Sequence, residues 1–313
     1  MQFKPNNNLL HLRPDSTDVI LKEYNLDKPG AMEESIKILR EWVKKQPHFT
    51  RTDFTDGYLR STILEGKGSI EKAKQFIDRM CTLRTLLPQC FGVIDVRNDF
   101  KNVFEVTTPV ILPNLTKEHY RVFISKLNTN VTDSAQIANY FRYGYLIGDY
   151  IKAHDIVTGY RLIVDFTDIN MMDLLTKLNP MDLRHALTIY LEGYGMKIKG
   201  IHLITASKFI DGLIVLLKQI LKPKVGGRIY VHKTCEDLHE IIGKDILPEE
   251  FGGYEKSLKA IHEDWLEELS REELKKYLRD INSAKTDEAC RPSVKFNEDY
   301  AGMPGTFRVL SLD

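Results

Sequence analysis

The sequence is poor in cysteine, has no net charge and contains no apolar run long enough to span a bilayer. Its four cysteines are scattered over 313 residues, which excludes a disulfide framework and predicts reduced thiols. A membrane-spanning helix needs about 20 apolar residues, whereas the longest apolar stretch, FIDGLIVLLKQIL (209–221), has thirteen residues. The N-terminal stretch MQFKPNNNLLHLRPD lacks the continuous apolar region of a signal peptide. We therefore expect a soluble, cytoplasmic protein.

Motifs that would indicate catalysis or cofactor binding are also missing. The sequence contains no G-x-S-x-G elbow, no phosphate-binding P-loop and no G-x-G-x-x-G dinucleotide motif. Cys235 and His239 stand four residues apart on an expected helix, but a zinc site needs further ligands. Asp165 and Asp168 follow an apolar run, and we interpret them as caps of the next turn. We expect no catalytic residue, no metal and no cofactor.

Charge is balanced over the whole chain but unevenly distributed along it. The 44 Lys and Arg residues match 44 Asp and Glu residues, so no overall field attracts nucleic acid and we expect no such partner. Residues 194–233 carry eight basic side chains against one acid, Asp211, and residues 236–280 carry fourteen acids against seven bases. The apolar stretch 209–221 therefore lies in the most basic part of the chain.

Helical periodicity dominates the first hundred residues, and nothing there has the period of a strand. The segments with helical spacing of apolar residues are 31–46, 52–64 and 69–88. They predict a small bundle, which we assign to an N-terminal helical lobe of residues 1–101.

Strands alternate with helices after Pro109. The runs with strand character span residues 120–127, 160–166, 200–205 and 228–233. Helical segments separate them, so the strands must be joined by crossovers in a largely parallel sheet. A highly charged helix is expected over residues 254–280. We assign residues 102–281 to this α/β lobe and residues 282–313 to a C-terminal tail.

The apolar segment 209–221 raises a question about its surroundings. Nine of its thirteen residues are large and apolar, and as a helix it leaves only a narrow polar strip at Asp211, Lys218 and Gln219. Such a helix is either an ordinary buried crossover or a cover over something apolar. Composition and spacing leave both interpretations open.

Four segments carry a resemblance to a known family. The run GIHLITASKFIDGLIVLLKQILKPKVGGRIYVHK is followed by DILPEEFGG, which contains an L-P-x-E-x-G-G element. LIVDFTDI is similar to a central strand of that family, DGYLRSTILEGKGSIEKAKQF to its preceding helical segment, and MPGTFRVLSLD to the tails of insect members. Together these segments resemble the CRAL-TRIO lipid-binding family, which includes carriers of tocopherol and retinaldehyde.

The resemblance implies both a fold and a function. The expected fold is a helical N-terminal lobe followed by an α/β lobe whose mainly parallel sheet floors an apolar cavity, with helix 207–221 as a movable gate. The expected function is intracellular binding and membrane-to-membrane transfer of one small hydrophobic ligand, such as a retinoid, tocopherol, carotenoid or phospholipid. The protein would be a monomer that associates with membranes transiently and peripherally through its basic region, and not an enzyme.

Similarity to the tocopherol carrier of the family assigns residues to the cavity wall. The assigned residues are Phe141, Val164, Ile169, Ile189, Tyr190, Tyr194, Ile198 and Ile201, with Phe209, Leu213 and Leu217 on the gate. Gly144 and Gly148 fall where that carrier has serines, which predicts a wider pocket with fewer polar partners. Tyr145 joins the predicted set because it, Tyr190 and Tyr194 would either offer replacement hydroxyls to a ligand or pack as aromatic residues.

Four basic residues match positions that bind phosphoinositide headgroups in the same carrier. They are Lys197, Lys199, Lys224 and Arg228. A fifth basic position falls on Thr62, with Arg60 two residues earlier, so the match is incomplete. We expect phosphoinositide recognition at this basic rim, with a generic solvated basic surface as the alternative.

Two other functions compete with the carrier hypothesis. In the first, the cavity is vestigial and the acidic segment 236–280 recruits a protein partner to an interaction or scaffold module. In the second, the chain is an α/β enzyme that uses Asp165 or His202 on a lipophilic substrate. Lipid that copurifies would favour the carrier, a stoichiometric protein complex the first alternative, and turnover of a ligand the second.

Overall fold

Four helices form an N-terminal lobe in the structure, a computed structural model that describes residues 9–92 and 95–292. They are α1 (Ser16–Glu23), α2 (Ala31–Lys44), α3 (Asp56–Glu65) and α4 (Ile70–Leu86). The side chains of Thr55 and Ser69 cap α3 and α4 by accepting hydrogen bonds from backbone amides three residues later. Leu39, Leu59 and Ile77 are buried in the core that these helices share, which confirms the helical lobe.

The second lobe is built on a five-stranded sheet. Its strands are β1 (Thr107–Ile111), β2 (Tyr120–Leu127), β3 (Gly159–Asp165), β4 (Ile198–Ile204) and β5 (Ile229–His232), in the order β1-β2-β3-β4-β5. Strands β2 to β5 run parallel, as predicted, and β1 pairs antiparallel with β2. The sequence does not predict β1 because Pro109 lies inside it. Proline is tolerated there since β1 is an edge strand.

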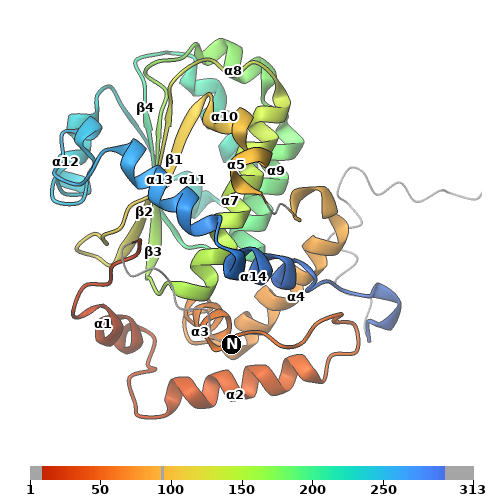
Figure 1. Cartoon of the computed structure of the whole chain (residues 1–313). Helices are drawn as coiled ribbons and strands as arrows, with labels where there is room; N and C mark the ends of the chain where they lie inside the picture. The colour runs from red at the N-terminus through yellow and green to blue at the C-terminus, as the bar shows by residue number, and fades with distance from the viewer. Residues whose placement is uncertain (1–8, 93–94, 293–313) are drawn as a thin grey trace, which may run out of the picture.

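The helices that join consecutive parallel strands lie on one face of this sheet. They are α7 (Ser134–His154), α8 (Met171–Lys177), α9 (Pro180–Thr188) and α10 (Ile210–Ile220), followed by the short α11 (Pro223–Gly226). Right-handed crossovers between neighbouring strands place every connecting helix on the same side. Figure 1 shows α7 to α10 on that side and α12 (Leu238–Ile241) on the other. One layer of strands and one layer of helices therefore enclose the space between them.

Two helices replace the single charged helix expected over residues 254–280. They are α13 (Leu258–Leu269) and α14 (Glu272–Asn282), which a short turn separates. The break has a physical reason, because the two helices bury their apolar faces against different parts of the protein. Trp265 of α13 donates a hydrogen bond to the carbonyl of Ile111 in β1 at 3.0 Å. Tyr277 of α14 donates instead to the carbonyl of Asp149 in α7 at 3.4 Å.

The segment after α14 returns to the N-terminal lobe. Phe49 and Thr286 form an isolated β-bridge, and the guanidinium of Arg291 contacts the carboxylate of Asp78 at 2.9 Å. The first part of the expected tail thus packs against the helical bundle. The motif MPGTFRVLSLD lies outside the described residues. The division into residues 1–101, 102–281 and 282–313 stays a prediction.

Candidate functional site

A cavity of about 250 Å³ lies between the sheet and its helical layer. The sheet contributes Phe123 from β2, Leu162 and Val164 from β3, and Ile201 and Leu203 from β4. Successive strand residues point to opposite faces of a sheet. Leu162 and Val164 remain partly exposed within a central strand because they face this cavity. The sheet therefore forms the floor of an apolar cavity.

Helix α7, with 21 residues, provides one wall of the cavity through a single stripe. Its cavity-facing residues recur at helical spacing and are Gln136, Ile137, Tyr140, Phe141, Gly144, Ile147, Gly148 and Ile151. The carboxylate of Asp133 fixes the start of the helix by accepting a hydrogen bond from the amide of Gln136 at 3.0 Å. Leu174 of α8 and Leu183 and Leu187 of α9 extend the wall.

Most polar groups in the cavity wall already have partners within the protein. These hydrogen bonds join Thr107 to Ser125 (2.9 Å), Gln136 to the carbonyl of Asn102 (3.2 Å), Tyr160 to Glu65 (3.1 Å) and Tyr190 to the carbonyl of Phe141 (3.2 Å). Burial raises the pKa of Tyr140 to about 12, so its hydroxyl stays protonated. A bound molecule would meet apolar surface almost everywhere, which suits a hydrocarbon rather than a polar metabolite.

Helix α10 covers the cavity with an apolar inner side, and its outer side carries both polar and apolar residues. Leu213 and Leu217 are buried and line the cavity, whereas Phe209 and Val215 on the outside are 40% and 54% exposed. The polar residues Asp211, Lys218 and Gln219 are exposed on the same outer side as Val215. The segment 209–221 therefore covers an apolar cavity and leaves two large apolar side chains at the surface. Of the helices within the described residues, none has the length and apolarity that crossing a membrane requires.

Two tyrosines fill the space beside Gly144 and Gly148, where the sequence predicts a wider pocket. The ring of Tyr194 lies so close to Gly148 that an added β-carbon would sit 2.9 Å from its ring carbons, and the hydroxyl of Tyr190 approaches Gly144 more closely still. The Tyr194 hydroxyl donates to the carbonyl of Tyr145 at 2.8 Å, and the Tyr190 hydroxyl makes the equivalent bond one turn earlier. The glycines thus make room for protein side chains, and both hydroxyls already have protein acceptors.

The residues predicted to bind ligand separate into two groups. Those that line the cavity are Phe141, Val164, Tyr190, Ile198, Ile201, Leu213 and Leu217. Those outside the wall are Tyr145, Ile169, Ile189, Tyr194 and Phe209. Tyr145, Ile189 and Tyr194 belong instead to a second core with Met80 and Leu83 of α4, which depends on how the lobes pack. Contact between the first group and a ligand stays a prediction.

Other cavity residues are missing from the sequence prediction although a pattern points to them. Leu162 and Leu203 lie two residues from Val164 and Ile201, so the strand period places them on the same face. Tyr140 belongs to the helical stripe of α7 in the same way. Met196 precedes β4 in a segment without regular periodicity, and no sequence signal would have found it.

Lys197, the first residue of the predicted basic rim, is turned toward the N-terminal lobe. Its ammonium group donates to the Tyr24 hydroxyl at 2.8 Å and to the Leu64 carbonyl at 3.0 Å, and lies 3.9 Å from the carboxylate of Glu65. Burial lowers the pKa of Lys197, and Glu65 opposes that effect. Thr62 on the neighbouring α3 is fully buried. This end of the rim joins the two lobes and offers little charge to solvent.

The other three residues of the predicted rim remain accessible. Lys224 in α11 is exposed. The guanidinium of Arg228 is partly buried and donates to the carbonyl of Ile198 at 2.6 Å. The Lys199 ammonium lies 4.9 Å from the ring centre of Tyr120. These three side chains remain at the surface, whereas the ammonium of Lys197 is engaged by the N-terminal lobe.

The two candidates for catalysis lie outside the cavity wall. Asp165 accepts a hydrogen bond from the amide of Thr167 at 2.9 Å and lies 3.3 Å from the ammonium of Lys126, which confirms its role as a cap of the next turn. His202 sits between two cavity-facing residues of β4, so it points to the opposite face, where it bonds to His232 at 3.0 Å. Neither side chain is placed to act on a molecule in the cavity.

The Cys235 and His239 pair is not a metal site in this geometry. The Nε2 atom of His239 lies 2.7 Å from the carbonyl of Phe251, so it donates a hydrogen bond there. Within the described residues, no three His, Cys, Asp or Glu side chains gather as metal ligands.

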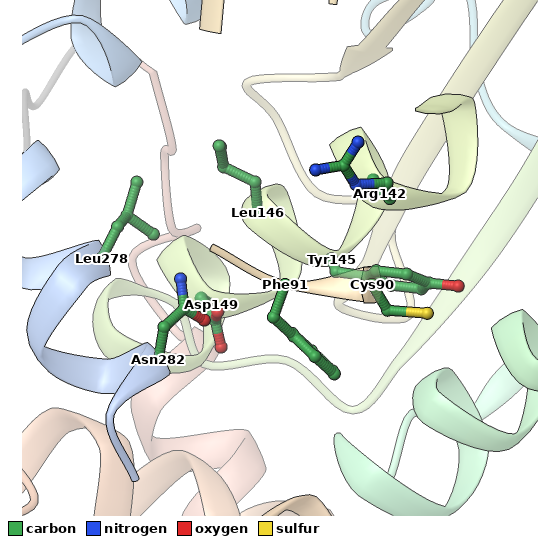
Figure 2. Close-up of a pocket in the computed structure, with 8 residues that line it drawn as sticks. All are labelled: Cys90, Phe91, Arg142, Tyr145, Leu146, Asp149, Leu278 and Asn282. Atoms are coloured by element: carbon green, nitrogen blue, oxygen red, sulfur yellow. The ribbon is translucent and has the colours of Figure 1, made fainter. Parts of the chain in front are cut away.

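A second, much smaller hollow lies where the two lobes meet. Figure 2 shows it among Phe91, residues of α7 and residues of α14, with the guanidinium of Arg142 on one side and Asp149 on the other. Its volume of about 10 Å³ is the space of one water molecule. Arg84 of α4 pairs with Asp149 at 2.7 Å, and both side chains are buried. This hollow is a joint between lobes and too small for a lipid.

Comparison with known proteins gives consistent matches. Residues 105–253 match the family model described as the CRAL/TRIO domain. An alpha-tocopherol transfer protein-like protein of Mus musculus is 21% identical over 230 residues, which cover 72% of this chain and 66% of that protein. Clavesin-1 of Rattus norvegicus is 24% identical over 258 residues, which cover 77% of this chain and 69% of that protein. The crystal structure of Sfh5 aligns with a TM-score of 0.49 and 11% identity over 74% of this chain and 91% of that one. The chain spans about two thirds of the length of the relatives it matches.

Proposed function

Residues 105–253 form a CRAL/TRIO domain, and from this premise we propose that the protein binds one small hydrophobic molecule in its cavity and transfers it between membranes. The observation that carries the proposal is the cavity itself. It lies between the sheet and its helical layer, is lined almost wholly by apolar side chains, and is covered by α10, whose Leu213 and Leu217 face it. Burial of apolar groups is worth about 0.8 kcal/mol per CH₂, so a hydrocarbon needs few polar contacts to bind tightly.

The size of the cavity limits what fits beneath α10 in this conformation. A cavity of roughly 150 Å³ holds benzene, so about 250 Å³ holds on the order of ten carbon atoms by the same ratio. A retinoid or tocopherol is larger and requires α10 to move outward. Movement of α10 would also expose Leu213 and Leu217, which would add to the apolar surface of the already exposed Phe209 and Val215. Such a surface is stable only against another apolar phase.

Basic residues around α10 suit contact with an anionic bilayer. Lys208, Lys218, Lys222 and Lys224 are all exposed at the ends and side of this helix. Each basic residue near an anionic surface contributes about 1 kcal/mol of attraction. We include Lys224 and Arg228 in a rim that recognises phosphoinositide-containing membranes, and we exclude Lys197 because it is engaged by the N-terminal lobe.

Organic extraction of the gently purified protein, followed by mass spectrometry, tests the proposal. We expect one dominant lipid near one molecule per chain. Leu203→Trp fills the cavity and should abolish this signal, whereas Val231→Trp places the same ring on the neighbouring strand β5, where Val231 pairs with Leu203 in register and is exposed. Val231→Trp should keep the lipid.

An empty extract would overturn the proposal if it persisted after incubation with a mixed lipid pool. In that case a stable complex with another protein would favour the interaction module. A product formed from a bound ligand would favour the enzyme. Equal lipid content in Leu203→Trp and wild type would show that lipid binds elsewhere on the protein.

A further inference from the structure

The polar groups of the cavity wall are concentrated where β1 and β2 meet the start of α7. Thr107 of β1 and Gln136 and Tyr140 of α7 line the cavity there, and both Thr107 and Tyr140 interact with the buried Ser125 of β2. Strand β1 forms one edge of the sheet, whereas α10 joins β4 to β5 at the other edge. The polar end of the cavity and its cover therefore lie at different edges of the sheet.

The hydroxyls of Thr107 and Ser125 form a hydrogen-bonded chain with a fixed direction. The Thr107 hydroxyl donates to the carbonyl of Lys126 at 2.9 Å. A hydroxyl has only one proton to donate, so Thr107 must accept in its contact of 2.9 Å with Ser125. Ser125 therefore donates to Thr107, and the Ser125 oxygen is left to act as an acceptor.

The Tyr140 hydroxyl is the next member of this chain and the one that reaches the cavity. Its hydrogen-bond partner in the protein is Ser125, whose own proton is directed to Thr107, so Tyr140 is the donor of the pair. Ser125 is fully buried, whereas Tyr140 is partly accessible and lines the cavity. Tyr140 thus presents to the cavity an oxygen that can accept a hydrogen bond, with its proton turned away.

The other two tyrosine hydroxyls of the wall also direct their protons into the protein. Tyr190 donates to the carbonyl of Phe141 at 3.2 Å, and Tyr160 donates to the carboxylate of Glu65 at 3.1 Å. Each of these hydroxyls retains an oxygen that can accept. The direction found at Tyr140 is therefore shared by the hydroxyl groups of the whole wall.

Gln136 provides one exception, but a less accessible one. Its carbonyl oxygen accepts from the amide of Thr132 at 2.7 Å and from the Thr132 hydroxyl at 3.1 Å, and its amide nitrogen donates to the carbonyl of Asn102 at 3.2 Å. Among the described residues of the wall, its second amide proton is the one side-chain donor left. Gln136 is buried, with 6% exposure, so Tyr140 is the polar group that a ligand meets first.

We propose that Tyr140 makes the cavity selective for a lipid alcohol, whose hydroxyl donates to the Tyr140 oxygen while its hydrocarbon chain extends toward α10. An aldehyde, ketone, ether or ester can only accept, so its oxygen would face the Tyr140 oxygen without a hydrogen bond. A buried polar group without a partner is costly, which disfavours such ligands. The inference rests on the proposed function and deepens it by naming the chemical class of the ligand.

Three ligands that differ at the polar end test this selectivity. Decan-1-ol has on the order of ten carbon atoms, which suits the cavity volume; its isomer 1-methoxynonane and the ketone decan-2-one have similar size but no proton to donate. Calorimetric titration of the full chain, after removal of copurified lipid, measures each affinity. We expect decan-1-ol to bind about fivefold more tightly than the other two, as one additional hydrogen bond implies.

Variants of the hydroxyl chain test the assignment to Tyr140. Tyr140→Phe removes the acceptor and should abolish most of the preference for decan-1-ol over 1-methoxynonane. Tyr143→Phe is the matched control, because Tyr143 lies on the same helix outside the cavity wall and its buried hydroxyl has no hydrogen-bond partner among the described residues. Its preference should equal that of wild type. Comparison of one ligand pair across variants cancels the difference in hydration between the two ligands.

Ser125→Ala makes the opposite prediction and so separates selectivity from damage to the fold. Loss of the Ser125 oxygen releases the Tyr140 proton, which can then donate to a ketone. Decan-2-one should bind roughly threefold more tightly than to wild type, a gain that a partly unfolded protein would not produce. Thermal unfolding checks the stability of each variant.

Two outcomes would overturn the inference while the proposed function stands. They are equal binding of the three ligands by wild type, and a loss of preference in Tyr143→Phe as large as in Tyr140→Phe. Failure of all three ligands to bind, together with an empty lipid extract, would overturn the proposed function as well.

Discussion

The ring of Tyr190 lies directly across Gly144 of α7, with its hydroxyl inside the space that a β-carbon at position 144 would occupy. Alanine in place of a mid-helix glycine normally stabilises a helix by about 1 kcal/mol. Here we expect Gly144→Ala to destabilise the protein by about 1–3 kcal/mol, because the methyl group forces Tyr190 out of its position. Urea denaturation of both proteins measures the difference.

Gly212→Ala is the matched control for this substitution. Gly212 lies in α10, and its nearest neighbour would be the flexible end of Leu175 at 3.2 Å. We expect this variant to be neutral or stabilised. Tyr190→Phe should relieve part of the cost of Gly144→Ala, since the hydroxyl is the closest atom. Strict additivity of the two substitutions would contradict the contact.

Tyr190→Val should enlarge the cavity and favour a longer ligand. Tyr190 lines the cavity at the place where its ring packs across α7. The ring therefore limits the length of the ligand that can fit. Each additional buried CH₂ is worth about 0.8 kcal/mol, or roughly a fourfold gain in affinity. Straight-chain alcohols of increasing length can be tested as competitors of the bound ligand. The chain length that binds most tightly should be longer for this variant than for wild type. An unchanged optimum would show that another residue sets the limit.

Val215→Asp should impair transfer between vesicles while leaving the fold intact. Val215 is 54% exposed on the outside of α10, so a charge there costs little in solution but opposes insertion into an apolar phase. We expect a several-fold slower transfer of a fluorescent lipid and an unchanged unfolding temperature.

Leu213→Asp provides the contrast on the same helix. Leu213 is buried against the cavity, so this substitution should lower stability as well as ligand content. A transfer rate equal to wild type in Val215→Asp would exclude the outer face of α10 as the membrane contact.

Arg84→Met should destabilise the contact between the lobes by about 3–5 kcal/mol. Arg84 of α4 and Asp149 of α7 pair at 2.7 Å with both side chains almost fully buried, and removal of one partner leaves an uncompensated buried charge. Urea denaturation measures the loss. The exposed pair of Arg97 and Glu263 is the control, because Arg97→Met should cost less than about 1 kcal/mol. Equal losses would mean that Asp149 finds another partner.

Acid should destabilise the protein through His202. Burial, followed by the charges of Arg161 and His232, lowers the pKa of His202 to about 4, whereas an unfolded chain has a histidine pKa of about 6.5. Between these values the unfolded chain binds a proton that the folded protein does not, so stability falls as pH drops from about 6.5 toward 4. The loss amounts to about 3 kcal/mol for this group. His202→Gln should lose less stability than wild type over that range, and parallel curves would contradict the assignment.

Local sequence patterns were sufficient to predict most of the helices and strands of the fold. The run 120–127 alternates along a single strand and coincides with β2, and the apolar segment 209–221 contains α10. The charged segment 254–280 shows the limit of periodicity, because the change of direction between α13 and α14 depends on β1 and α7 as packing partners.

The orientation of a side chain in the candidate site was predictable where a single helix or strand determines it, and not where it depends on contact between the two lobes. The inward position of Leu213 and Leu217 follows from helical spacing on α10. Lys197 turns inward because Tyr24 and Leu64 of a distant part of the chain supply acceptors. The crossing of Tyr190 over Gly144 is likewise a long-range contact that no spacing rule contains.

The alternation of β3 has a consequence for how this protein and its relatives can diverge. Leu162 and Val164 touch whatever occupies the cavity floor, while Arg161 between them belongs to the opposite face. Substitutions at the even-numbered positions would change the cavity floor without changing the opposite face of the sheet, and a substitution at the odd-numbered position would do the reverse. One strand thus allows the two faces of the sheet to vary independently within three consecutive residues.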